Sequence, residues 1–416
     1  MQKILVVAGG GAAGFFCAVT AARLNPELKV ILVEKSGKLL SKVKVSGGGR
    51  CNVTHACFSI PDMVKKYPRG SNFVKKTFHQ FFTTDTIQWF EERGVPLKTE
   101  EDGRMFPETN SSQTIIDCLY REASQFGVEI RIHHEIRSLE YKINAASFTI
   151  FFNNDLILDA DFICVASGGY PKSAMFDWIL KTGHHIEEPV PSLFTFNMPG
   201  NSITSLMGIS VREAQIRISG EDLKERGPLL ITHWGMSGPA ILKLSAWGAR
   251  ILKTKEYRFE IRVNWLGDLT DQLLRDEIVT IRESSGGKKI WQKNPWELPQ
   301  RLWEWQLEQA GIKDIHWADL PAALQNKLIQ QLTNQSFTVE GKTTFKEEFV
   351  TAGGLRLAEI SHQTMESRIV PGLYFAGEVM DVDGVTGGFN FQHAWTSGFI
   401  AGKSIALKAQ SAKPNA

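Results

Sequence analysis

Apolar residues at the start of the chain form two blocks separated by glycines. Residues 3–8 (KILVVA) have the continuous hydrophobicity of a buried parallel strand, and residues 29–34 form a second such run. Between them lie a glycine-rich turn at 9–14 and a helical pattern over 12–24, which ends shortly before a proline. This order predicts the first βαβ unit of a doubly wound α/β sheet.

The rest of the pattern divides the chain into three stretches. Up to about residue 190 we expect a long loop over 35–60, helices over 72–82, 85–93 and 112–126, antiparallel strands within 135–159 and a strand over 162–166. Beyond it we expect strands broken by glycine and proline up to 265, one helix after Pro239, and mostly helices over 268–333. After about 345 the pattern predicts a strand over 373–376 and a helix over 391–408.

The return of the α/β pattern near the end suggests how the domains are arranged. The simplest architecture is one α/β domain made from residues 1–190 and 346–416, with residues 191–345 inserted into it.

Cysteine usage indicates a reducing compartment. The five cysteines are an odd number and none has CxxC spacing, which argues against a disulfide framework and a structural zinc site. We therefore expect a cytoplasmic protein without a metal. Residues 4–22 carry no charge, as in a signal peptide or a membrane span, but three consecutive glycines make a poor hydrophobic segment. A strand, a turn and a helix explain them better, so no membrane segment is expected.

The net charge of +2 hides an uneven distribution. Residues 1–80 hold 13 basic and three acidic residues, and the basic ones concentrate within 35–76. This pattern fits either a solvated face or a surface that attracts a polyanion such as RNA.

The turn at 9–14 has the spacing of a dinucleotide-binding fingerprint. Gly9 permits the tight turn, Gly11 lets the backbone approach a pyrophosphate, and Gly14 allows close packing of helix against strand. Glu34 follows 20 residues later at the end of the second strand, where a carboxylate accepts hydrogen bonds from an adenosine ribose. In this context the turn predicts dinucleotide binding.

The C-terminal segment indicates that the dinucleotide is FAD. The predicted strand at 373–376 ends in Gly377 and Glu378, an arrangement that flavoproteins use to hold the ribityl chain. Residues 387–390 (GGFN) then open a helix whose backbone N–H groups would stabilise negative charge on the reduced flavin ring. No second dinucleotide fingerprint is found, so NADPH or NADH is expected only as a transient electron donor.

A third glycine-rich segment lies at 46–52 (SGGGRCN). Three glycines offer bare backbone to a ligand, and Arg50 supplies a fixed cation. Cys51 is the candidate catalytic proton donor beside the flavin, and a small buried side chain is the alternative. The residues expected to hold the cofactor are Gly9, Gly11, Ala12, Ala13, Gly14, Glu34, Lys35, Lys42, Ser46, Gly47, Gly48, Gly49, Arg50, Cys51, Asn52, Ala166, Ser167, Gly168, Gly377, Glu378, Gly387, Gly388, Phe389 and Asn390.

Six motifs together resemble one known family. They lie at residues 9–14, 46–52, 103–107 (GRMFP), 232–239 (THWGMSGP), 364–367 (TMES) and 377–390. In this order they resemble the bacterial BaiN-type flavoproteins, also described as aminoacetone-oxidase-like NAD(P)/FAD-dependent oxidoreductases. The resemblance covers essentially the whole chain, but after Gly169 the later glycines of the family pattern are missing.

The resemblance implies a fold and several activities. The fold is a Rossmann-like FAD-binding domain split by an insert with a small β-barrel at about 191–265 and a helical cluster at about 266–335. Some members are linked to reduction of carbon–carbon double bonds, including uridine in ribosomal RNA, and others to small amines or steroids. The basic face favours RNA, and His233 and Trp234 are candidate substrate contacts. An oxidase or reductase of a small amine or steroid-like molecule stays open, as does a non-catalytic flavin-binding assembly or sensor protein.

Overall fold

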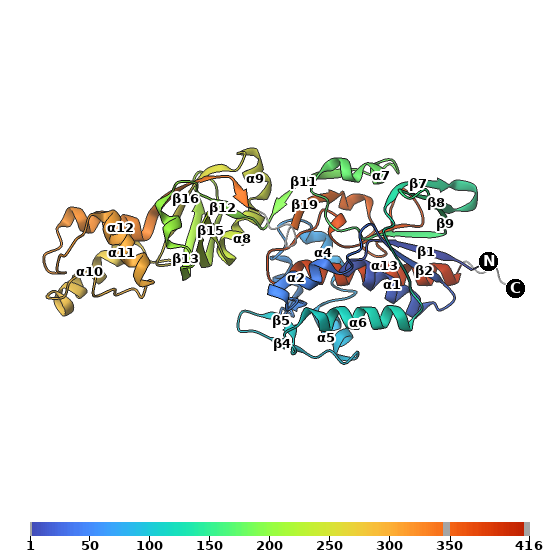
Figure 1. The fold of residues 1–416 in the computed structure, drawn as a ribbon, viewed down its shortest axis with the longest axis horizontal. Coiled ribbons are helices and arrows are strands. Elements are labelled where there is room, and N and C mark those ends of the chain that lie inside the picture. Colours follow the sequence, from blue (N-terminus) through green and yellow to red (C-terminus); the bar gives the residue numbers. More distant parts are fainter. Residues whose placement is uncertain (1, 344–349, 412–416) are drawn as a thin grey trace. The chain divides into compact units, whose positions relative to one another are not determined.

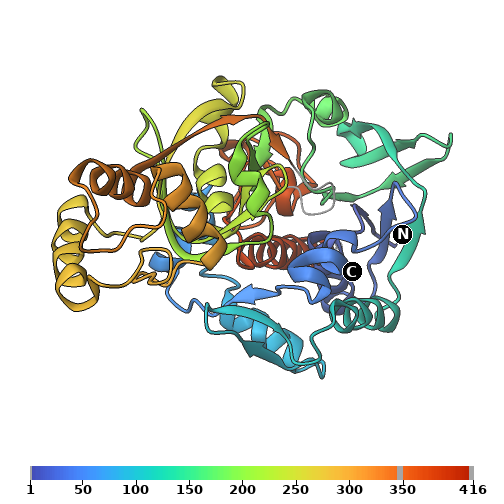
Figure 2. The same cartoon turned by 60° about the vertical axis from the view of Figure 1, so that its left-hand side comes forward.

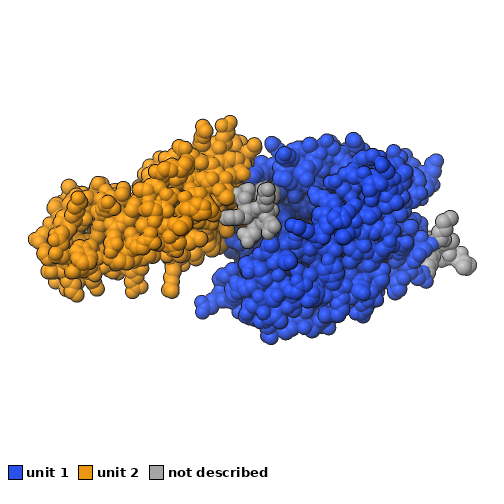
Figure 3. All heavy atoms as spheres, in the orientation of Figure 1, with its two compact units in different colours: residues 1–191, 346–416 blue, residues 192–345 orange. Residues whose placement is uncertain are grey.

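The computed structural model describes residues 2–343 and 350–411. The chain forms two compact units, coloured separately in Figure 3: Met1–Pro191 with Lys346–Ala416, and Ser192–Phe345. We call them unit 1 and unit 2. That residues 191–345 form a separate, independently folding domain stays a prediction.

Unit 1 is built around a parallel sheet of five strands in the order β20-β10-β1-β2-β6. These strands are β1 (Ile4–Ala8), β2 (Lys29–Glu34), β6 (Glu129–Ile132), β10 (Phe162–Val165) and β20 (Leu373–Phe375). The central strands are buried along almost their whole length, which explains their unbroken apolar sequences. The strands predicted at both ends of the chain therefore belong to one sheet.

Two helices from opposite ends of the chain pack side by side in unit 1. They are α1 (Ala12–Leu24) and α13 (Phe389–Ser411), which Figures 1 and 2 show in blue and red. A Cβ on Gly398 would lie 2.5 Å from the Ala13 oxygen, and one on Gly402 would lie 2.4 Å from the Cys17 oxygen. The two glycines let the helix backbones approach closely.

Unit 1 contains six further α-helices and several smaller groups of strands among its described residues. The helices are α2 (Ser41–Gly49), α3 (Ile60–Val64), α4 (Ser71–Thr77), α5 (Thr83–Glu91), α6 (Ser112–Gln125) and α7 (Asp177–Leu180). One three-stranded sheet has the order β3 (Thr54–His55), β5 (Arg104–Pro107) and β4 (Leu97–Thr99). A second has the order β7 (Ile136–Lys142), β8 (Ser147–Phe152) and β9 (Ile157–Ala160). Strand β11 (Ile186–Ser192) pairs with β19 (Val350–Leu355). The loop predicted over 35–60 is wrong in part, because α2 and the start of α3 lie there. Glycines at 47–49 obscured the helical pattern, and α2 itself is interrupted at Ser46–Gly48.

Unit 2 contains a seven-stranded antiparallel sheet in the order β17-β16-β13-β14-β15-β12-β18. The strands are β12 (Thr195–Asn197), β13 (Ser210–Ile218), β14 (Lys224–Thr232), β15 (Gly235–Ser237), β16 (Arg258–Asn264), β17 (Gln335–Glu340) and β18 (Lys342–Thr343). The outer strands β17 and β18 are separated in the chain by Gly341 alone. Closure of this sheet into a barrel stays a prediction.

The helices of unit 2 have a tryptophan-rich core. They are α8 (Pro239–Trp247), α9 (Ala249–Thr254), α10 (Asp271–Ser285), α11 (Gln300–Ala310) and α12 (Ala322–Asn334), so a second helix, α9, follows the one predicted after Pro239. Trp303 and Trp317 are fully buried and stacked, whereas Trp291 is 43 % exposed. Trp303, Trp305 and Trp317 are thus core residues of this unit.

Candidate functional site

The candidate site lies where the parallel strands of unit 1 end. In the sheet, β1 has β2 on one side and β10 on the other. The strands that follow β1 in the chain are thus added first on one side and then on the other, so the strand order reverses between β1 and β10. In doubly wound folds ligands bind outside the carboxyl ends of the strands at this point. The segments after β1, β2, β10 and β20 are those that the sequence singled out.

The first turn brings three chain segments together. Gly9 has φ +122°, its N–H donates to the Val33 oxygen at 2.8 Å, and a Cβ there would lie 2.3 Å from the Ala166 oxygen. A Cβ on Gly11, by contrast, would meet no atom within 4 Å in the described part of the chain. Gly11 precedes α1 and has no side chain to cap it, so the helix N-terminus faces an open space suited to an anion.

Glu34 is held firmly at the end of β2. Its Oε2 accepts from the Gly10 N–H at 3.0 Å, and its Oε1 accepts from the N–H and hydroxyl of Ser36 at 2.9 and 2.8 Å. A carboxylate oxygen can accept more than one hydrogen bond, so Glu34 retains capacity for a ribose hydroxyl. The next residue, Lys35, has its ammonium 5.6 Å from the centre of the Tyr170 ring.

The segment 46–52 forms a sharp turn at the end of α2. Gly47, Gly48 and Gly49 all have positive φ (59°, 68° and 85°), and Cβ atoms on the last two would meet nothing within 4 Å among the described residues. The backbone is thus bare on the side of these two glycines, as close approach of a ligand requires.

Cys51 is fully buried in the same turn. Its φ is +62° and its N–H donates to the Ser46 oxygen at 2.9 Å. Burial raises the pKa of its thiol to about 12, although a hydrogen bond with Ser46 lowers it. These facts favour the small buried side chain over an exposed proton donor, and a catalytic role for Cys51 stays a prediction.

The segment after β20 is tied to α2 and to α13. Glu378 forms an ion pair with Lys42 at 2.5 Å and accepts from the Thr351 N–H at 2.9 Å. Gly377 has φ +74° and donates its N–H to the Ser397 hydroxyl of α13 at 2.8 Å. Lys42 and Glu378, distant in sequence, are therefore neighbours at this edge.

The turn before α13 packs against the segment around β3. The Asn52 amide, oriented to suit both partners, accepts from the Gly388 N–H and donates to the Thr54 oxygen, each at 3.0 Å. A Cβ on Gly388 would lie 2.6 Å from the Thr54 carbonyl. The side-chain amide of Asn390 makes two 2.8 Å bonds to the backbone of Gly384, which closes the loop. Asn52 already accepts the Gly388 N–H, and the Gln392 N–H donates to the Gly388 oxygen at 2.9 Å, so the N–H groups of residues 389–391 are the ones left to face a ligand.

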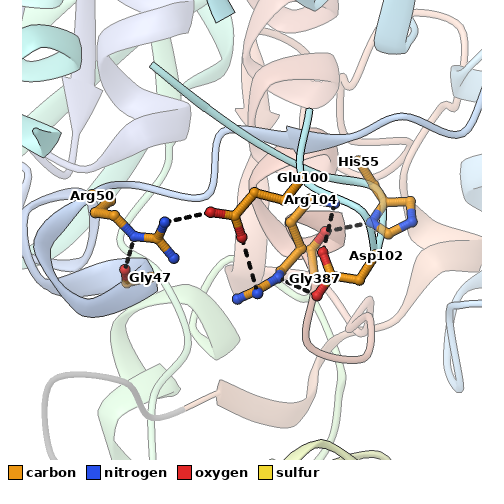
Figure 4. Close-up of polar contacts among 7 residues, drawn as sticks. All are labelled: Gly47, Arg50, His55, Glu100, Asp102, Arg104 and Gly387. Atoms are coloured by element: carbon orange, nitrogen blue, oxygen red, sulfur yellow. Dashed lines mark hydrogen bonds and ion pairs between the residues drawn. The ribbon is translucent and has the colours of Figure 1, made fainter. Parts of the chain in front are cut away.

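A polar cluster that the sequence reasoning missed borders these turns (Figure 4). Glu100 accepts from Arg50 at 2.5 Å and from Arg104 at 3.1 Å, and the two guanidinium groups lie 4.0 and 5.5 Å from the centre of the Phe106 ring. Arg50 Nε also donates to the Gly47 oxygen at 3.3 Å. The motif at 103–107, which contains Arg104 and Phe106, was the sequence signal that could have indicated this cluster.

His55 connects the cluster to α13. Its Nδ1 lies 3.1 Å from the Gly387 oxygen, and its ring centre lies 4.7 Å from that of Phe389. A Cβ on Gly103 would lie 2.6 Å from the His55 Nε2, so the glycine leaves room for the imidazole. His55 follows the 46–52 motif by three residues, which is the only sequence signal for it.

His233 and Trp234 belong to unit 2, whereas the segments just described belong to unit 1. His233 is exposed between β14 and β15, its ring 4.2 Å from that of Trp234, whose Nε1 donates to the Thr195 hydroxyl at 3.0 Å. Their contact with a substrate stays a prediction. Unit 2 also has a polar cleft of about 390 Å³ that includes Arg217 and Arg262 and none of the expected site residues.

Several basic side chains of the stretch 35–76 are engaged in ion pairs. Arg69 is only 9 % exposed and forms a bidentate ion pair with the buried Asp383. Lys42 and Arg50 are paired with Glu378 and Glu100, as described above. The exposed cations of the stretch, besides Lys65, which pairs with Asp62 at 2.8 Å, are Lys35, Lys38, Lys44, Lys66, Lys75 and Lys76.

Among residues 2–343 and 350–411, no helix is both long and apolar enough to cross a membrane. Within the same ranges, no group of three or more potential metal ligands is found.

A doubly wound sheet with a fingerprint turn, a carboxylate at the end of β2 and glycine-rich turns at its carboxyl edge is typical of dinucleotide-binding proteins. Residues 3–404 match the family model described as "HI0933-like protein Rossmann domain". The chain therefore belongs to this family of FAD-dependent oxidoreductases.

Similar curated proteins span the whole chain. The ribosomal RNA dihydrouridine synthase of Escherichia coli is 30 % identical over 98 % of this chain and 98 % of its own length. That of Haemophilus influenzae is 28 % identical over 96 % and 98 %, respectively. The 3-dehydro-bile acid delta(4,6)-reductase of Clostridium scindens is 25 % identical over 98 % and 99 %.

Solved structures show the same fold at low sequence identity. A flavocytochrome c3 fumarate reductase has a TM-score of 0.51 at 17 % identity, covering 98 % of this chain and 78 % of that one. The 3-ketosteroid-delta4-(5alpha)-dehydrogenase of Rhodococcus jostii has a TM-score of 0.52 at 12 % identity, covering 97 % of each chain.

Proposed function

We propose that the protein reduces a carbon–carbon double bond conjugated with a carbonyl group, with FAD held at the carboxyl edge of the parallel sheet. The observation that carries the proposal is the meeting of the segments after β1, β2 and β20 with the 46–52 turn at that edge. The open backbone at Gly11, Gly48 and Gly49 is a cradle that added Cβ atoms would fill.

The residues present fit FAD. The turn at Gly11 and the N-terminus of α1 would hold the pyrophosphate, Glu34 the adenosine ribose, and the Gly377–Glu378 segment the ribityl chain. The N-terminus of α13 would face the pyrimidine end of the flavin ring. When bound, FAD supplies two-electron chemistry, accepting and giving a hydride.

The Arg50–Glu100–Arg104 cluster suits the charge that such a reduction develops. When a hydride adds to a conjugated double bond, negative charge grows on the carbonyl oxygen. Donors placed in advance near that oxygen lower the barrier. Arg50 and Arg104 are half-exposed donors bordering the Gly47 turn. We therefore propose that they bind the substrate carbonyl or a neighbouring anionic group.

For the substrate we favour uridine in ribosomal RNA. Uracil has a double bond conjugated with a carbonyl, and two relatives carry the name ribosomal RNA dihydrouridine synthase. The exposed lysines between 35 and 76 would contact phosphates. A steroid-like enone is the second candidate, because a third relative is named as a bile acid reductase and its substrate shares the conjugated system.

The electron donor is proposed to be NADPH or NADH, bound weakly and briefly. The chain has one dinucleotide fingerprint, and FAD would occupy it. Titration of FAD-loaded protein should show no tight, stoichiometric nicotinamide site.

The test supplies FAD-loaded protein and NADPH with unmodified ribosomal RNA or, separately, with a 4-en-3-one steroid. We expect dihydrouridine in the digested RNA by mass spectrometry. Saturated steroid without dihydrouridine would favour the small-molecule alternative. Neither product, together with stable FAD binding, would favour the non-catalytic flavin protein. Fast reoxidation of the flavin in air without RNA would instead indicate an oxidase.

A further inference from the structure

A buried histidine of α13 lies at the carboxyl edge and is absent from the residues discussed so far. His393 is one helical turn after Phe389, and its ring is 2 % exposed. Its Nε2 lies 3.3 Å from the Gly377 oxygen, in the segment that follows β20. The imidazole is therefore next to the chain segment assigned to the ribityl chain.

The contact with Gly377 determines which ring nitrogen carries the proton. A carbonyl oxygen only accepts, so Nε2 must donate, and in the neutral ring Nδ1 is then an acceptor. Burial lowers the pKa of His393 to about 4, with Glu378 as the charged neighbour that opposes the shift. The ring is thus neutral at neutral pH and Nδ1 keeps its lone pair.

The Nδ1 atom of His393 is buried without a hydrogen-bond partner among the described residues. Buried polar groups in native proteins almost always have one, and an exception suggests an absent ligand or water. Two nearby donors are already engaged. The Gly377 N–H donates to the Ser397 hydroxyl at 2.8 Å, and that hydroxyl donates to the His393 oxygen at 2.6 Å.

We propose that His393 Nδ1 accepts a hydrogen bond from a ribityl hydroxyl of the flavin. The inference rests on the proposed FAD site. An unpartnered acceptor needs a donor, and the ribityl hydroxyls are the donors of FAD expected beside Gly377. His393 is thus a cofactor contact that no glycine or acid motif would show.

Two substitutions separate the functions of the two ring nitrogens. His393→Gln can place an amide nitrogen near the position of Nε2 and keep the donor to Gly377, but it loses the acceptor at Nδ1. His393→Asn can place an amide oxygen near the position of Nδ1 and keep that acceptor, but it loses the donor to Gly377. The matched pair therefore distinguishes a contact with the cofactor from support of the backbone.

The probes are FAD and three analogues that each lack one ribityl hydroxyl, at the 2′, 3′ or 4′ carbon. Dissociation constants are measured for the wild type and both variants. We expect one analogue to bind the wild type and His393→Asn about five- to tenfold more weakly than FAD, and His393→Gln to bind that analogue and FAD equally. Ser397→Ala, which disturbs Gly377 without touching Nδ1, should weaken all four ligands alike.

A second measurement covers variants that fail to fold. In the wild type labelled with ¹⁵N-histidine, the Nδ1 resonance of His393 should move toward the hydrogen-bonded range with FAD and less with the discriminated analogue. Equal binding of FAD and all analogues by the wild type, or an Nδ1 resonance that FAD leaves unchanged, would overturn the inference. Failure of FAD itself to bind would instead overturn the proposed function.

Discussion

Among single residues, Gly11 links the fingerprint turn most directly to a ligand. Its Cβ position is empty in the described structure, although the neighbouring glycines of the turn are tightly packed. Gly11→Val would therefore be tolerated by the protein but would occupy the place of the pyrophosphate. Losing even a few charge-assisted hydrogen bonds at about 1.5–3 kcal/mol each should lower FAD affinity by orders of magnitude.

The measurement for Gly11→Val is the flavin content after reconstitution with FAD. Gly287→Val is the matched control, because a Cβ at Gly287 also meets nothing within 4 Å among the described residues and lies outside the site. The control should retain wild-type content, and a Gly11→Val protein with full FAD content would contradict the assigned turn.

The buried imidazole of His393 should also make the free energy of unfolding of the protein without FAD depend on pH. Its pKa falls from 6.5 to about 4 on folding, mainly through burial, so between these values the unfolded chain binds a proton that the folded chain does not. Stability should fall by up to about 3 kcal/mol as the pH drops from 6.5 to 4. This portion of the loss should vanish in His393→Gln, as urea unfolding at several pH values will show; identical pH profiles would contradict the assignment.

The sequence could indicate Gly9, Gly11 and Glu34 because they have a known spacing, which a single chain is enough to recognise. The structure places the two glycines directly after β1 and Glu34 at the end of β2, and cofactor binding by these residues stays a prediction. His55, Glu100 and Arg104 were missed because their arrangement depends on strands β3 and β5, which pair residues about 50 positions apart. His393 could not be distinguished from any helical core histidine without its environment.

At the level of elements, the contact between α1 and α13 holds the first turn and the last helix in one body. A side chain at Gly402 would collide with the Cys17 carbonyl at 2.4 Å and the Thr20 Cβ at 2.9 Å. Gly402→Leu should therefore destabilise unit 1 by about 1–3 kcal/mol despite the better helix propensity of leucine. Urea unfolding measures the effect, and Lys403→Leu, at an exposed neighbouring position, should stay within about 0.5 kcal/mol of the wild type. Equal stability of the two variants would mean that the helices do not pack this closely.

Periodicity predicted the elements that are long or buried on both faces. The strands at residues 3–8, 29–34 and 162–166 and the helix at 391–408 correspond to β1, β2, β10 and α13. The helix α2 was missed because it is short and its last three residues are glycines with positive φ. The pairing order of the sheet in unit 2 depends on contacts between distant strands, and local patterns do not encode it.

On the scale of the whole molecule, the uneven charge distribution is the feature that separates RNA from a small substrate. Arg69, Lys42, Arg50 and Lys65 are engaged in ion pairs, so Lys66, Lys75 and Lys76 are the better test positions. If all three touch phosphates, replacing them with Gln should flatten the slope of log affinity against log salt by about two units for single-stranded RNA. The exposed Lys172, Lys181 and Lys403, replaced together, give a control with the same change in charge. Absence of RNA binding, or an equal slope in both triple variants, would mean that the basic stretch is a solvated face that does not bind RNA.

The identity of the bound cofactor tests the central claim, an FAD site at the carboxyl edge of the parallel sheet. Of the two flavin nucleotides, the pyrophosphate turn and Glu34 fit FAD, because FMN has neither a pyrophosphate nor an adenosine ribose. The measurement is heat release of the flavin from the protein as purified, without added flavin, followed by chromatography against standards; protein that carries no flavin is then reconstituted with FAD. We expect one FAD per chain. FMN in the released fraction, or no flavin after reconstitution, would contradict it.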